Sequence, residues 1–186
     1  MEPLLARVRA CRLCEEQLEP RPVLRLSAHS RILLVGQAPG SRVHASGVPW
    51  DDDSGERLLG WLGVSRTVFE HPANFAILPM GFCYPGKGAS GDLPPPPICA
   101  QTWHGPLVEG MAPRLTLLVG QYAQKRYLGR ERRRNLTETV RAALDYGERL
   151  PLPHPSWRVQ GWMKRNPWFE AEILPVLRSR VCTALS

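Results

Sequence analysis

The sequence predicts an α/β fold: a single domain, residues 1–186, in which a central parallel four-stranded sheet is flanked by helices. Continuous apolar runs recur along the chain and stop at glycine or proline, as is typical of parallel strands covered on both faces. Segments with helical spacing of apolar residues separate these runs. With 186 residues, 43% of them apolar, the chain can bury one core without disulfides.

The predicted strands are four short apolar runs. The first, residues 31–36, reads Arg-Ile-Leu-Leu-Val-Gly, and residues 75–79 and 115–120 have the same character. A shorter run flanked by proline, residues 150–152, is the predicted fourth strand. Because the carboxyl ends of parallel strands share one edge of a sheet, we expect the loops that follow these runs to meet at a ligand site.

The predicted helices lie between and around these strands. Six segments have the helical spacing of apolar residues: 1–15, 54–62, 98–109, 122–128, 136–146 and 167–182. We expect Ser54 to cap the second of these helices, and the last has a proline in its first turn. Within them we expect Cys182 and three tryptophans, Trp61, Trp103 and Trp168, to be buried. For His44 and His104 we expect surface or capping roles.

Charge and cysteine content narrow the function. Lysine and arginine exceed the acids by 24 to 17, so the net charge is +7, which favours an anionic polymer such as nucleic acid as partner. The N-terminus resembles no signal peptide, and no apolar run approaches the roughly 20 residues of a membrane span. We therefore expect a cytoplasmic protein, in which the five cysteines serve metal or redox chemistry and not disulfides.

Two loops that follow predicted strands contain the candidate chemistry. Residues 36–40, Gly-Gln-Ala-Pro-Gly, form neither a phosphate loop nor a dinucleotide fingerprint. Residues 154–156, His-Pro-Ser, follow the last strand. Between them, Trp50 precedes three aspartates and a helix start, a pattern that offers a stacking surface and a carboxylate base. The alternative is that Asp53 or Ser54 caps the helix and the other acids are solvated, and that His154 is structural.

These loops, in this order, resemble the first and second motifs of the uracil-DNA glycosylase superfamily, and the resemblance extends from Cys11 to Trp157. Four cysteines, spaced as a CxxC pair, a long gap and a shorter gap, are similar to those of its iron-sulfur branch, the fourth family. They are Cys11, Cys14, Cys83 and Cys99. The resemblance implies that these thiolates hold a [4Fe-4S] cluster, and tetrahedral zinc is the alternative.

The resemblance also implies an activity and its residues. The protein would be a monofunctional DNA glycosylase, without a lyase step, that excises uracil or another deaminated base in base excision repair. Asp52, or else Asp51, would stabilise the oxocarbenium ion and orient water, while His154 would hold the departing base. The implied base-binding residues are Gly36, Gln37, Ala38, Trp50, Pro79 and Ser156, and those implied to contact DNA are Trp157, Arg158, Lys164 and Arg165.

Two positions depart from the iron-sulfur branch and make the active site divergent. Gln37 stands where many members have glutamate, and Pro79 stands where they have the asparagine that reads the uracil edge. The alternative functions are therefore a non-catalytic or covalent uracil-DNA-binding protein of the same fold, and a zinc-stabilised adaptor. In the catalytic interpretation the protein is a monomer acting on DNA that contains a damaged base.

Overall fold

The computed structural model describes residues 1–89 and 91–186, and its centre is a parallel sheet of four strands. The strand order is β2-β1-β5-β6, and Ile32 of β1 lies opposite Phe75 on one side and Leu115 on the other. The strands are β1 (Ile32–Val35), β2 (Phe75–Ile77), β5 (Leu115–Val119) and β6 (Arg149–Leu152). The predicted α/β fold is confirmed.

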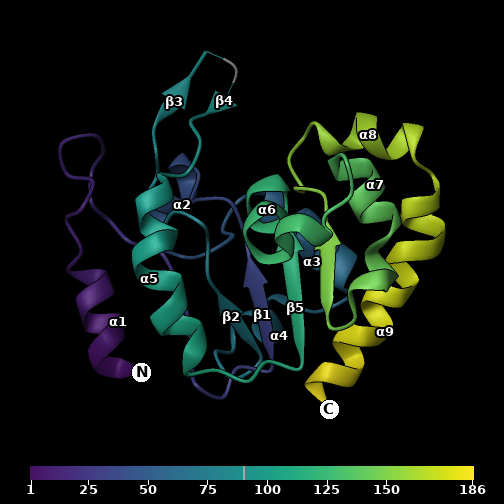
Figure 1. Cartoon of the computed structure of the whole chain (residues 1–186), viewed down its shortest axis with the longest axis horizontal. Helices are drawn as coiled ribbons and strands as arrows, with labels where there is room; N and C mark the ends of the chain where they lie inside the picture. The colour runs from purple at the N-terminus through teal and green to yellow at the C-terminus, as the bar shows by residue number, and fades with distance from the viewer. Residues whose placement is uncertain (90) are drawn as a thin grey trace.

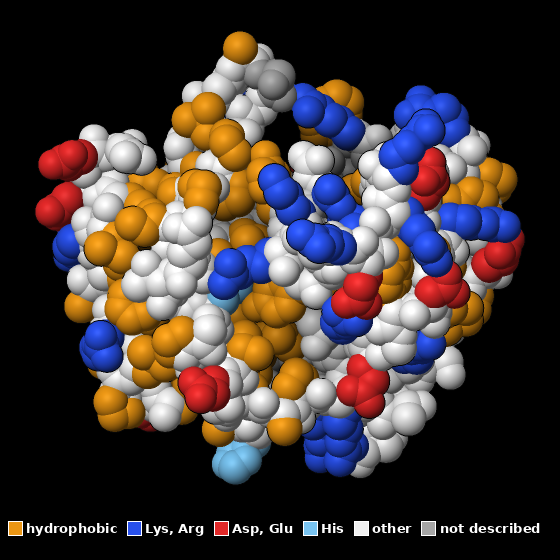
Figure 2. All heavy atoms as spheres, in the orientation of Figure 1, with side chains coloured by type: hydrophobic (Ala, Val, Ile, Leu, Met, Phe, Trp, Pro, Cys, Tyr) orange, Lys and Arg blue, Asp and Glu red, His pale blue; other side chains and the backbone are white. Residues whose placement is uncertain are grey.

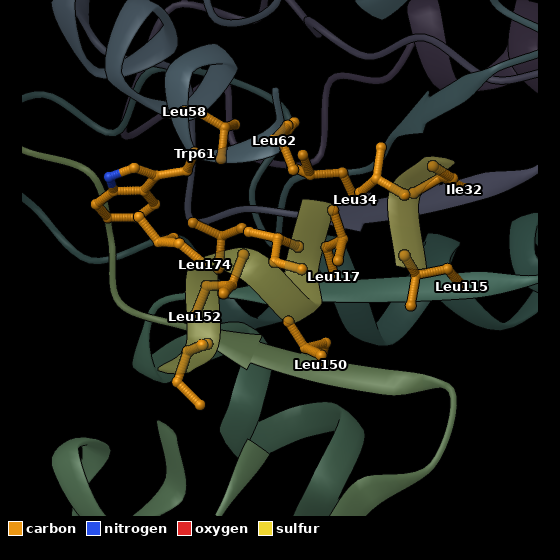
Figure 3. Packing of buried hydrophobic residues seen from close by; sticks show 14 of the residues in the cluster. Ile32, Leu34, Leu58, Trp61, Leu62, Leu115, Leu117, Leu150, Leu152 and Leu174 are labelled. Atoms are coloured by element: carbon orange, nitrogen blue, oxygen red, sulfur yellow. The ribbon is translucent and has the colours of Figure 1, made fainter. Parts of the chain in front are cut away.

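Helices cover both faces of the sheet because alternate residues of each strand point to opposite sides. Ile32 and Leu34 pack with four helices: α3 (Asp53–Leu62), α4 (Arg66–Glu70), α7 (Leu136–Arg141) and α9 (Leu174–Leu185). Figure 3 shows part of this layer, with Trp61 and Leu174 over the strands. Leu33 and Val35 pack with α1 (Glu2–Arg9), α5 (Pro97–Glu109) and α6 (Gln121–Leu128).

The smaller elements gather mostly at the carboxyl ends of the strands. They include α2 (Ser41–Ser46), α8 (Val159–Arg165) and an antiparallel hairpin of β3 (Lys87–Gly88) and β4 (Gly91–Asp92). Figure 1 shows the hairpin and α8 beyond the end of the sheet to which β1 points, and both chain termini at the opposite end. The hairpin, α2, α4 and α8 were not predicted.

Three predicted helices differ in extent. The first ends at Arg9, and the CxxC segment that follows forms turns. The segment 136–146 divides into α7 and the 3-10 helix Ala143–Tyr146. The last divides into the π-helix Phe169–Ile173 and α9, because Pro175 has no N–H for the regular helical ladder. A further 3-10 helix, Gly129–Glu131, follows α6.

The burial predictions for the helices hold in part. Trp61 and Trp103 are buried, and Trp168 is partly buried against the core. The prediction for Cys182 is wrong: its side chain is exposed, because Val181 and Ala184 present the apolar face of α9 to the sheet. Among the described residues no helix combines the length and apolarity that a bilayer crossing requires.

Candidate active site

A cavity of about 720 Å³ lies at the carboxyl edge of the sheet, lined by loops that follow all four strands. Residues 36–40 follow β1, Pro79 follows β2, Tyr122 lies beyond β5, and His154 follows β6. After β1 the chain continues to β2 at one edge of the sheet, and after β5 it continues to β6 at the other edge. A crevice therefore opens between the carboxyl ends of β1 and β5. The two loops singled out in the sequence therefore meet at one site, as predicted.

Trp50 forms one wall of the cavity in a strained backbone conformation, with φ of 60°. Its ring lies on Gly36, where an added Cβ would come within 3.1 Å of Trp50 Cζ2. At Gly55 an added Cβ would lie 1.8 Å from the Trp50 carbonyl oxygen. The ring centroid of His154 lies 5.7 Å from that of Trp50. Glycine at 36 and 55 thus allows an aromatic surface beside the imidazole.

Asp52 has two roles, one for each carboxylate oxygen. It is the N-cap of α3, with Oδ1 accepting the Gly55 N–H at 2.8 Å, so the alternative in which Asp53 or Ser54 caps this helix is wrong. Asp52 Oδ2 lies 3.8 Å from the Cβ position of Gly40, and the residue lines the cavity. The cap therefore fixes one oxygen and leaves the other facing the first loop.

The surroundings of His154 in the cavity favour the neutral form of its ring. Burial lowers its pKa, while the carboxylates of Asp52 and Asp92 act in the opposite direction. Gly120, with φ of +86°, leaves 3.5 Å between its Cβ position and the Cβ of His154. Arg57 of α3 donates to the Pro155 carbonyl at 2.5 Å and ties this loop to the helix. A neutral imidazole offers one N–H donor to a ligand.

The structure separates the other predicted residues into two groups. Gln37, Ala38, Ser156, Trp157 and Arg158 line the cavity. Trp157 is 73% exposed, and the Arg158 guanidinium lies 5.3 Å from its ring centroid, so both face outward at the rim.

Three predicted residues do not line the cavity. Asp51 is exposed and lies outside it, which leaves Asp52 as the member of the pair with access to a ligand. Lys164 and Arg165 are exposed in the last turn of α8, away from the cavity lining. Figure 2 shows lysine and arginine side chains gathered over α6, α7 and α8, and such a surface attracts polyanions.

Sequence reasoning missed several lining residues, and Asp92 is the most consequential. It ends β4 and brings a further carboxylate to the cavity, whereas Arg57 and Tyr122 come from helices α3 and α6. The glycine-rich segment 86–91 was the available signal, because such a segment indicates a turn between short strands.

The four cysteines of the predicted cluster site line a second, small cavity together with Phe82. The Phe82 N–H donates to Cys99 Sγ at 3.3 Å. Burial is the main reason that the pKa of Cys83 is raised and that of Cys99 is raised to about 12, with the neighbouring cysteines adding to both. Four sulfur donors with a backbone N–H directed at one of them fit a thiolate-bound group, which would displace the thiol protons.

The thiols are gathered at one cavity but are not closed around a point. Across residues 1–89 and 91–186, no group of three or more His, Cys, Asp or Glu side chains is arranged to hold a metal ion.

His104 is buried, so the surface or capping role predicted for it is wrong. Its Nε2–H donates to the Pro79 carbonyl at 3.0 Å, and its Nδ1 accepts from the Tyr127 hydroxyl at 2.9 Å. The ring stacks on Phe82 with a centroid distance of 5.8 Å. His44 is partly buried, with Nε2 3.1 Å from a carboxylate oxygen of Glu19.

We expect His104 to make stability depend on pH. Burial lowers its pKa from 6.5 to about 4, and the charge of Arg126 acts in the same direction. Between these values the unfolded chain binds the proton and the folded chain does not, so the free energy of unfolding falls as pH falls from 6.5 toward 4. The loss is on the order of 3 kcal/mol.

Urea unfolding at several pH values measures this effect. In His104→Gln the free energy of unfolding should change less between pH 6.5 and 4 than it does in wild type. His29→Gln, which alters an exposed histidine, should retain the wild-type dependence of this free energy on pH. An equal dependence on pH in all three proteins would refute the assignment.

The fold and the cavity define a class: α/β proteins that bind a ligand at the carboxyl ends of parallel strands, here beside a basic surface suited to a polyanion. The model of the uracil DNA glycosylase superfamily matches residues 25–178. The chain belongs to that superfamily, which confirms the resemblance at the level of the superfamily. The match begins after Cys11 and Cys14, so it does not bear on the iron-sulfur branch.

Proposed function

We propose that the protein is a monofunctional DNA glycosylase that excises uracil or another deaminated base by hydrolysing the N-glycosidic bond. The observation that supports this most is that Asp52 and His154, about one hundred residues apart in the chain, line the same cavity beside Trp50. The cavity can admit a single base, and the enzyme would reach the bond only after turning the nucleotide out of the duplex.

The groups in the cavity suit a dissociative cleavage. As the bond to the base lengthens, positive charge develops on the sugar and negative charge on the base. Asp52 Oδ2 would stabilise the sugar cation, while the His154 N–H and the backbone amides of Gln37 and Ala38 would donate to the base oxygen. Each such donor in a dry site contributes about 3 kcal/mol to lowering the barrier.

The rim of the cavity suits DNA. Trp157, exposed at the rim, would fill the gap left by the extruded nucleotide, and Arg158 beside it would bind phosphate. Lys164 and Arg165 would extend the phosphate contacts along α8. In this proposal the protein acts as a monomer in base excision repair, in the cytoplasm where it meets genomic DNA.

A second candidate function is a non-catalytic or covalent uracil-DNA-binding protein of the same fold. Gln37 and Pro79 both line the cavity, and neither side chain can act as a base. A protein that binds an extruded base without releasing it would have the same fold and rim.

An excision assay distinguishes the two functions. The protein is incubated with an oligonucleotide that contains one uracil, and the product is treated with alkali, which breaks the strand at an abasic site. We expect strand breaks only after alkali. An intact oligonucleotide retained in a complex would support the binding protein instead, and parallel substrates with hypoxanthine, xanthine or mismatched thymine define the preferred base.

We also propose that Cys11, Cys14, Cys83 and Cys99 hold a [4Fe-4S] cluster, with zinc as the alternative. The shared cavity and the N–H directed at Cys99 Sγ support the donor set. When bound, such a group would cross-link the turn after α1 to the segments around Cys83 and Cys99 and stabilise the fold.

A further inference from the structure

The β3–β4 hairpin brings a third carboxylate into the cavity, in addition to Asp52 and to Asp53, whose Oδ1 is paired with Arg42 Nη1 at 2.9 Å. Asp92 pairs with Lys87 in the hairpin and lines the cavity opposite the α3 terminus. Its Oδ2 lies 3.7 Å from the Cβ position of Gly40, and Asp52 Oδ2 lies 3.8 Å from the same position. The two oxygens are therefore at most about 7.5 Å apart, and the absence of a side chain at residue 40 keeps the space between them open.

Asp52 and Asp92 each have one carboxylate oxygen that accepts a hydrogen bond. Asp52 Oδ1 accepts the N–H that caps α3, and Asp92 Oδ1 accepts the Tyr84 hydroxyl at 3.4 Å. Tyr84 in turn packs on His44, with ring centroids 5.9 Å apart. The Oδ2 atoms of both aspartates are left facing Gly40.

The hairpin is also close to the second motif. The Cβ position of Gly91 lies 3.7 Å from Nη2 of Arg158, in the loop that contains His154. Asp92 is close enough to His154 to influence its ionisation, as is Asp52. Three groups from α3, the hairpin and the loop after β6 thus face one space.

We infer that Asp92 is a second catalytic carboxylate, which orients and deprotonates the attacking water while Asp52 stabilises the sugar. This inference rests on the proposed function. Both Oδ2 atoms lie within 4 Å of the same point beside Gly40, so a water bound there would be within reach of each carboxylate. The side chain of Gln37, the other polar group of the first loop, cannot accept the proton.

The step balances as a hydrolysis. The electron pair of the bond between C1′ and the base nitrogen leaves with the base, whose oxygen is held by the His154 N–H. The water oxygen forms the new bond to C1′, and its proton passes to Asp92 Oδ2. That proton then returns to the released base through solvent, so neither oxidant nor reductant is needed.

The test compares single-turnover excision rates of wild type, Asp92→Asn, Asp92→Ala and Tyr84→Phe on the same uracil oligonucleotide, with binding measured separately. We expect Asp92→Asn to excise about 100-fold more slowly with DNA affinity unchanged or higher, because a negative charge is lost. Tyr84→Phe should lower the excision rate about tenfold, because it removes the hydroxyl that donates to Asp92 Oδ1. Sodium formate should restore part of the rate to Asp92→Ala, whose cavity has room for it, and none to Asp92→Asn. Glu170→Gln, an exposed acid in the π-helix, is the matched charge control.

Either of two results would overturn the inference while the proposed function stands. An Asp92→Asn rate within twofold of wild type would leave Asp92 without a chemical role while the glycosylase activity stands. A rate loss equal to a loss of DNA affinity, without formate rescue, would make Asp92 a binding residue only. If wild type excises no base at all, the proposed function fails and this inference fails with it. Because Asp92 is exposed, its variants should have the same melting temperature as wild type.

Discussion

Asp52→Asn should lower the single-turnover excision rate about 10²- to 10³-fold and leave DNA binding intact. The amide retains the shape of the carboxylate but not its charge, so the developing sugar cation loses its stabilising partner. Asparagine caps helices as well as aspartate does, and the bond to the Gly55 N–H should persist. The thermal midpoint should therefore match wild type, which separates a catalytic defect from a folding defect.

Two companion variants sharpen this test. Asp52→Ala removes both the charge and the cap, so it should lose the same activity and in addition about 1 kcal/mol of stability. Asp51→Asn changes the neighbouring exposed carboxylate and should retain activity. Full activity in Asp52→Asn, or its loss only in Asp51→Asn, would remove Asp52 from the mechanism.

Cys99→Ser should prevent binding of the proposed metal group and lower the thermal midpoint by roughly 10 °C. A cross-link between distant segments contributes about 2–4 kcal/mol, and 1 kcal/mol corresponds to about 2–4 °C in a chain of this size. Protein purified without oxygen should be brown and contain iron and acid-labile sulfide, and the variant should be colourless. Iron, sulfide and zinc analyses with a melting curve measure these effects.

Cys182→Ser is the matched control, because it removes an exposed thiol on α9 that lies away from the cysteine cavity. It should retain colour, metal content and melting temperature. A colourless wild type that contains one zinc per chain would show that zinc is the bound group in place of the cluster. A wild type that binds neither iron nor zinc would refute the cofactor proposal.

The segment 79–83 connects the two cavities. Pro79 lines the candidate active site, whereas Phe82 and Cys83 line the cysteine cavity. Between them, the N–H groups of Met80 and Gly81 donate to the carbonyls of Gly36 and Gln37, each at 3.0 Å. Backbone hydrogen bonds therefore join the segment between the two cavities to the first loop of the candidate active site.

The sheet and the two motif loops were predictable because their signals are local. A run such as Ile32–Val35, apolar at every position and followed by glycine, is typical of a strand covered on both faces. Asp51 and Asp52 could not be separated in the same way. Asp52 both caps α3 and faces the cavity because the helix begins at Asp53, and helix boundaries are weakly encoded.

The sequence by itself determined the strand runs, the order of the two motifs and the positive charge, because these depend on residue type and spacing. Only the tertiary structure decided that Asp92 reaches the cavity and that His104 is buried. Both depend on contacts between segments distant in the chain: Asp92 reaches the first loop at Gly40, and His104 binds Pro79 and Tyr127. Such pairings follow from packing of the whole chain, and no local pattern encodes them.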